Sequence, residues 1–149
     1  MTSGILLLNK KTGISSARSL APLKRIFPGR KIGHTGTLDP FASGLLVVLV
    51  GSATRLSRWF LALDKRYVGS IRFGIETDTL DPEGTITANA PIPSPEVLHA
   101  VSERFLGEIK QIPPAYSALK IDGARAYRLA RAGKTVEIPA RTVTVYDLQ

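Results

Sequence analysis

The residue best suited to chemistry is an aspartate in a stretch with two glycines, Gly33-His34-Thr35-Gly36-Thr37-Leu38-Asp39-Pro40. The glycines allow backbone conformations that other residues avoid, and Pro40 keeps Asp39 extended and out of a helix. A carboxylate displayed on such a loop could serve as a nucleophile or as an acid–base group. Aspartate before proline is also common in solvated turns, so the residue types alone leave both interpretations open.

The segments that flank this loop predict that a core supports it. Residues 45–50 are apolar, rich in β-branched types and bounded by glycines, which indicates a buried strand. Residues 5–8 form a second short apolar strand. Ser15 and Ser16 are suitable N-caps for a helix in which Pro22 predicts a kink or a late start.

The rest of the chain mixes helices and strands without strict alternation, which is typical of the α+β class. We therefore expect a mixed, mainly antiparallel sheet with flanking helices. The expected elements are a helix capped by Ser52 with Leu56 and Trp59 in the core, a strand over 65–74, a helix from Ser94 with Phe105 facing inward, a helix from Asp122-Gly123 to Gly133, and a strand over 143–148.

The composition narrows the possible partners. The chain has 20 Lys and Arg against 12 Asp and Glu, a net charge of +8, which favours a polyanion such as nucleic acid. It has no cysteine and two histidines, so we expect no disulfide, no thiolate metal site and no histidine-rich zinc site. The acidic stretch 76–84 does not have the spacing of an EF-hand and is expected to be a solvated turn. The longest apolar run is about a third of a membrane span, so we expect no membrane contact and a cytoplasmic location.

Basic residues gather in two places that could contact phosphates, although either group could also be a solvated face. The candidates are Lys24, Arg25, Arg30 and Lys31 before the glycine loop, and Lys120, Arg125, Arg128 and Arg131 near the C-terminus.

Five motifs follow one another along the chain. They are Gly4–Ser16, the Gly33–Pro40 loop, Lys65-Arg66-Tyr67, the segment 74–84 and the segment 111–133. In this order they resemble the TruB family of tRNA pseudouridine synthases, whose catalytic motif is G-H-T-G-x-L-D-P. A mild departure is Asn9-Lys10-Lys11, where many members have Asp-Lys-Pro.

The resemblance implies an activity and a set of site residues. Asp39 would be the nucleophile that isomerises uridine 55 in the T arm of tRNA, by attack on the sugar or base or through a glycal. Tyr67 would pack against the target base, and His34 would occupy space in the opened RNA loop. The remaining substrate-binding candidates are Lys10, Gly33, Thr35, Gly36, Thr37 and Leu38. No cofactor is implied, and the full-length protein is expected to be a monomer.

The resemblance also implies that residues 1–149 are a partial catalytic domain, with an RNA-gripping insertion at about 105–135. Family members continue into a segment whose arginine pairs with the catalytic aspartate. We therefore expect a fold that is incomplete at its C-terminal end, with an exposed strand edge, and reduced or no activity of this chain alone.

A non-catalytic RNA-binding module is the alternative, because Gly33-His34-Thr35-Gly36 fits the G-x-x-G loop with which KH domains clamp a nucleic-acid backbone. An Asp39 facing bulk solvent, remote from any positively charged hollow wide enough for an everted pyrimidine, would refute the synthase interpretation.

Overall fold

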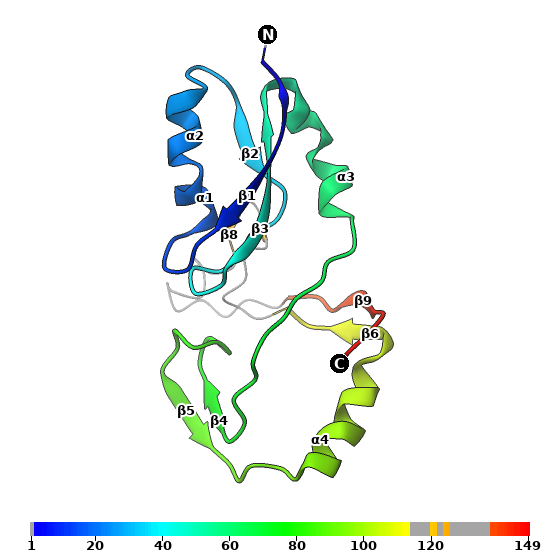
Figure 1. Ribbon diagram of the computed structural model, residues 1–149. Helices are drawn as coiled ribbons and strands as arrows, with labels where there is room; N and C mark the ends of the chain where they lie inside the picture. The colour runs from blue at the N-terminus through cyan, green and yellow to red at the C-terminus, as the bar shows by residue number, and fades with distance from the viewer. Residues whose placement is uncertain (1, 114–119, 122–123, 126–137) are drawn as a thin grey trace. The chain divides into compact units, whose positions relative to one another are not determined.

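The computed structural model describes residues 2–113, 120–121, 124–125 and 138–149, and the chain divides into two compact units, Met1–Val68 and Gly69–Gln149 (Figure 1). Each unit combines helices with antiparallel strands, so the expected α+β class is confirmed. No helix within the described ranges has both the length and the apolar character needed to cross a membrane.

The first unit is built on a three-stranded antiparallel sheet in the order β1-β3-β2. Strands β1 (Gly4–Lys10) and β3 (Gly44–Val50) pair along their whole length, and β2 (Ile32–His34) pairs with the end of β3. The predicted strand over residues 45–50 is confirmed, and its side chains include most of the buried apolar residues of the structure. The sheet therefore holds both ends of the segment that carries Asp39.

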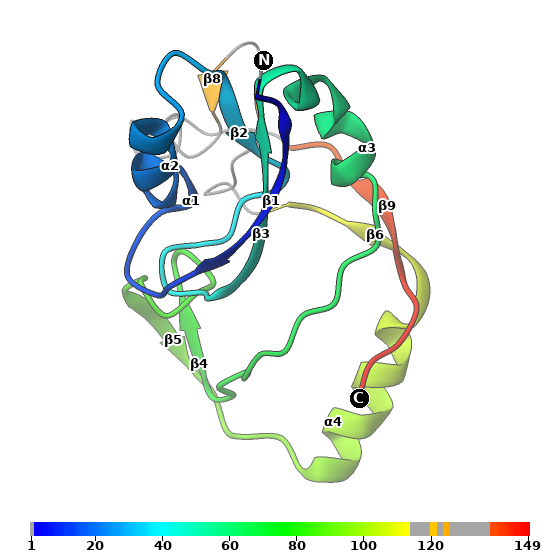
Figure 2. The ribbon, with the colours of Figure 1, turned by 45° about the horizontal axis from the view of Figure 1, so that its top comes forward.

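Two short helices cover one face of this sheet (Figures 1 and 2). Ser15 caps α1 (Ser16–Ser19) by accepting a hydrogen bond from the Arg18 amide, and Pro22 lies in the first turn of α2 (Ala21–Ile26). The proline thus separates two helices, as its fixed φ and missing N–H predict. Leu20, between the helices, packs with the β3 side chains of Leu46 and Val48 to form the core.

The chain after β3 departs from two expectations. The 3₁₀ helix η1 (Gly51–Leu56) leads into α3 (Ser57–Leu61), but Leu56 and Trp59, expected in the core, are 42% and 53% exposed. No strand is present over residues 65–74, because this segment has no hydrogen-bonded partner strand within the described residues, and alternation of side chains needs such a ladder to form a sheet.

Within its described residues, the second unit contains three separate strand pairs, one α-helix and one 3₁₀ helix. Ser94 caps α4 (Pro95–Ser102), as predicted, and η2 (Glu103–Phe105) follows, but Phe105 is half exposed and not core. The paired strands are β4 (Ile75–Thr77) with β5 (Ile86–Asn89), β6 (Gly107–Gln111) with β9 (Arg141–Val145), and β7 (Lys120–Ile121) with β8 (Ala124–Arg125). The helix expected from Asp122 is wrong at its start, because Ala124–Arg125 is extended and pairs with β7; its remainder lies outside the described residues.

The acidic stretch 76–84 joins β4 to β5 as a turn. An Asp81 carboxylate oxygen accepts from the Thr79 hydroxyl at 2.6 Å and from the Glu83 amide at 2.9 Å. An Asp78 oxygen accepts from the Thr85 amide at 2.8 Å. The carboxylates therefore bind donors of their own loop, as Asp side chains in turns commonly do.

Candidate active site

The loop that carries Asp39 begins at the end of β2 and returns to the start of β3. The Thr35 amide donates to the Val47 carbonyl at 2.9 Å, which keeps the first loop residue attached to β3. Gly36 has a φ of 124°, in the region that side chains other than glycine rarely adopt. The Nδ1 atom of His34 contacts the Gly36 carbonyl, and because a carbonyl only accepts, this nitrogen carries the proton. The other ring nitrogen of His34, Nε2, takes no part in this contact.

Lys10 anchors the far side of the loop. Its side chain is 1% exposed, and the ammonium group lies within hydrogen-bond distance of four backbone carbonyls. Two of these belong to the loop, Pro40 at 3.3 Å and Ala42 at 2.7 Å. The other two belong to the turn after β1, Lys11 at 3.0 Å and Ile14 at 2.8 Å. Lys10 therefore joins two segments about thirty residues apart. Its ammonium binds backbone carbonyls of the protein itself, which supports a positioning role for Lys10 in addition to the predicted substrate contact.

Ser16 and Gly13 hold the residues on either side of Asp39. The Ser16 hydroxyl donates to the Leu38 carbonyl and accepts from the Leu38 amide, both at 2.9 Å. The Gly13 amide donates to the Pro40 carbonyl at 2.8 Å. Both neighbours of Asp39 are therefore fixed through backbone groups, while its own carbonyl accepts from the Ala42 amide at 3.1 Å. The loop displays the carboxylate without using it as a structural group.

The Asp39 side chain is exposed, and within the described residues its carboxylate has no hydrogen bond or ion pair. It lines neither of the two hollows described below. Neither of these two hollows thus provides the positively charged hollow expected at the acid. The acid is nevertheless set in a strongly basic unit: Met1–Val68 has eleven Lys and Arg against two acids, whereas Gly69–Gln149 has nine against ten.

The other predicted site residues fall into two groups. Thr35, Gly36, Thr37 and Leu38 share the loop with Asp39, and Gly33 and His34 lead into it from β2. Tyr67 lies after α3 in a segment without regular structure and is 72% exposed. No hydrogen bond, strand pairing or hollow among the described residues joins Tyr67 to the loop.

The predicted phosphate contacts are also divided. Lys24 and Arg25 lie on α2, and Arg30 and Lys31 lie directly before β2, all four exposed. Lys120 and Arg125 are paired residues of β7 and β8 in the second unit, whereas Arg128 and Arg131 lie outside the described residues.

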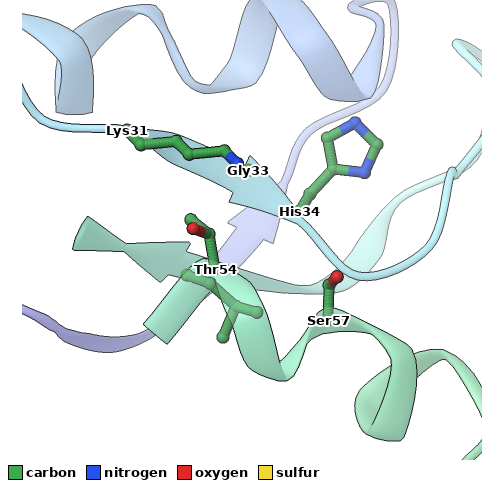
Figure 3. A pocket seen from close by; sticks show the side chains of 6 residues that line it. Lys31, Gly33, His34, Thr54 and Ser57 are labelled. Carbon is green, nitrogen blue, oxygen red and sulfur yellow. The ribbon is translucent and has the colours of Figure 1, made fainter. Parts of the chain in front are cut away.

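A hollow of about 200 Å³ lies between β2 and the helical segment after β3 (Figure 3). It is lined by Lys31, Gly33, His34, Leu49, Thr54 and Ser57. The two hydroxyl residues were not expected from the sequence, where they are part of an ordinary helical pattern. The one signal in the sequence that could have indicated Thr54 and Ser57 is their position directly after the core strand, on a helical segment that must start beside the loop. A second hollow of about 200 Å³ lies beside β1, α1 and α2 and includes Lys10 and Arg18.

A short antiparallel sheet with an anchored glycine loop that displays a carboxylate defines this part of an α+β protein. Its fold resembles a chain of a solved structure titled "Crystal Structure of a Cbf5-Nop10-Gar1 Complex", with a TM-score of 0.55, 25% sequence identity, and coverage of 97% of this chain and 34% of that one.

Residues 24–149 match the family model described as TruB family pseudouridylate synthase (N terminal domain), and the chain belongs to this family. Its relatives include proteins named tRNA pseudouridine synthase B. The one from Borreliella burgdorferi (strain ZS7) is 51% identical over 150 residues, covering 100% of this chain and 53% of that protein. The one from Francisella tularensis subsp. tularensis (strain WY96-3418) is 47% identical, covering 99% and 50%. The chain thus spans about half the length of the curated relatives it matches.

Proposed function

We propose that this chain provides the nucleophile-bearing part of a tRNA pseudouridine synthase, with Asp39 as the nucleophile and uridine 55 in the T arm as the target. The observation that supports this best is the anchoring of Asp39. Lys10, Gly13 and Ser16 hold the backbone on both sides of it, and its carboxylate is exposed and unpaired within the described residues. A group that is positioned by its neighbours and takes part in no structural contact is suited to act on a substrate.

The reaction needs little more than such a group from this chain. The bond between N1 of uracil and C1′ of the ribose breaks, the freed base turns, and C5 then bonds to C1′. The hydrogen on C5 leaves to solvent and N1 gains a proton, so the reaction is an isomerisation and consumes no cofactor. A carboxylate can attack at the sugar or at the base, or can assist formation of a glycal.

The remaining roles belong to the same proposal. Tyr67 offers an aromatic face to the everted base, and His34 occupies space in the opened RNA loop. The substrate is the T-arm stem–loop of tRNA, and the protein acts as a monomer in the cytoplasm. Because Asp39 has no cationic partner within the described residues, the chain alone turns over slowly or not at all.

Release of tritium from RNA labelled at C5 of uridine measures the reaction directly, because that hydrogen leaves in every turnover. We expect little release by the 149-residue chain alone. A chimera in which this chain replaces the matched half of the Borreliella burgdorferi relative should release tritium, and Asp39→Ala in the chimera should abolish release while RNA binding is kept.

Two results would contradict the proposal. An active chimera that keeps its turnover after Asp39→Ala would show that this aspartate is not the nucleophile. RNA binding by the chain and by the chimera, with no turnover in either, would instead support a non-catalytic module that uses the Gly33–Gly36 loop. Near-native turnover by the chain alone would contradict only the expectation that it is inactive by itself.

A further inference from the structure

The hollow beside β2 contains cationic and hydroxyl groups that the reaction does not use. Lys31, directly before β2, is exposed, and no carboxylate within the described residues lies at ion-pair distance from it. Figure 3 shows its side chain running along β2 toward Gly33, with the hydroxyls of Thr54 and Ser57 on the facing helical segment directed toward β2. An ammonium and a hydroxyl on opposite walls of one hollow can bind the same anion from two sides.

The two hydroxyls differ in what they can donate. Thr54 Oγ1 donates to the Gly51 carbonyl at 2.8 Å, so its proton is already used and its oxygen remains as an acceptor. Ser57 Oγ has no hydrogen-bond partner among the described residues. Ser57 is therefore the donor that is available to a ligand, and Thr54 shapes the wall.

The walls of the hollow are held together by the backbone. The Gly51 amide donates to the Lys31 carbonyl at 2.8 Å, which joins the start of η1 to the residue before β2. Ile32 pairs with Val50 in the sheet, and Leu49, which also lines the hollow, is 1% exposed. The backbone at Lys31 and at the start of η1 is thus fixed before any ligand binds, which lowers the ordering cost of binding.

We infer that this hollow binds one phosphodiester of the RNA backbone, through the Lys31 ammonium and the Ser57 hydroxyl. The inference rests on the proposed RNA substrate and adds a binding residue, Ser57, that the motifs did not suggest. His34 forms part of the rim and begins the loop that leads to Asp39. A phosphate bound here therefore belongs to a nucleotide near the everted base, and it fixes the register of the strand relative to the carboxylate. The large positive excess of the first unit favours the approach of such a strand.

The test is the salt dependence of RNA binding. A fluorescently labelled T-arm stem–loop is titrated with the chain between about 50 and 200 mM KCl, and the slope of log affinity against log salt is measured. Loss of one phosphate contact lowers the magnitude of this slope by about 0.7 to 0.9. We expect that decrease for Lys31→Gln, together with roughly tenfold weaker binding at low salt. Lys31→Arg should keep the slope.

The hydroxyl gives an independent readout. Ser57→Ala should weaken binding about two- to tenfold without a change in slope, because it removes a hydrogen bond and no charge. Arg72→Gln is the control for a loss of charge elsewhere, since Arg72 is exposed, belongs to none of the five motifs and lines neither hollow. Ser52→Ala is the control for the hydroxyl, because Ser52 binds Ser3 at the other end of η1.

The inference is overturned if Lys31→Gln changes the slope no more than Arg72→Gln does, if Ser57→Ala binds as tightly as the unchanged chain, or if the chain binds no RNA. These outcomes are distinct from failure of the proposed function, which would appear as missing tritium release in a chimera whose RNA binding shows the expected slopes.

Discussion

Replacement of Ser16 by alanine tests whether the loop is held in the way described. Ser16 is 2% exposed, and its hydroxyl makes two hydrogen bonds to one residue, Leu38. Each such bond contributes about 0.5 to 1.5 kcal/mol, so Ser16→Ala should destabilise the docked loop by about 2 kcal/mol. Because Leu38 directly precedes Asp39, this loss acts on the carboxylate's position while leaving the carboxylate itself unchanged.

The measurement is amide hydrogen exchange followed by NMR. A change of about 2 kcal/mol corresponds to roughly thirtyfold faster exchange of the Leu38 amide, which in the unchanged chain donates to Ser16. The Gly13 amide donates to the Pro40 carbonyl and should also exchange faster, because it reports undocking of the same loop. Amides of the β1–β3 ladder should change little.

Ser19→Ala is the matched control. Ser19 is also buried and lies in the same helix, but its hydroxyl makes one bond, to the Ser15 carbonyl at 3.1 Å. It should cost about 1 kcal/mol and leave Leu38 exchange unchanged. If Ser16→Ala accelerates the Leu38 amide no more than Ser19→Ala does, the two-way bond does not hold the loop and the positioning argument is wrong.

Two further substitutions test the loop by urea unfolding, followed by the fluorescence of Trp59, the chain's single tryptophan, which lies in the first unit. Lys10→Met removes the ammonium from the Pro40 and Ala42 carbonyls and should lower the free energy of unfolding by about 3 kcal/mol. Lys11→Met, at an exposed position, is the control and should change it by less than about 0.5 kcal/mol. Equal effects would disprove the anchoring role of Lys10. Gly36→Ala should lower the free energy of unfolding by about 1 to 3 kcal/mol. The whole effect comes from the φ of 124°, because a Cβ at this position would lie within 4 Å of no other atom. Gly33→Ala is the control: it has the same space and no positive φ, so it should be nearly neutral.

The sequence predicted features that depend on neighbouring residues. The caps at Ser15 and Ser94 and the break at Pro22 follow from backbone groups within a turn or two, and all are found in the structure. The buried strand over residues 45–50 followed from its uninterrupted apolar character. The two wrong predictions, the strand over 65–74 and the buried positions of Leu56 and Trp59, have the same cause. An alternating segment forms a strand only beside a partner strand, and apolar helix residues are buried only under a covering surface. The described residues supply neither.

By itself the sequence determined that a single aspartate sits in a glycine loop next to a core strand, on a chain with a large positive charge, and that its motifs resemble one family of RNA-modifying enzymes. Only the tertiary structure decided which side chains hold that loop and which remain available. Lys10 binds the Pro40 and Ala42 carbonyls, Ser16 binds Leu38, and Lys31 and Ser57 line one hollow. The residues of each pair are more than twenty positions apart in the sequence. These contacts depend on the register of β1 and β2 against β3, and no local pattern of residue types specifies that register.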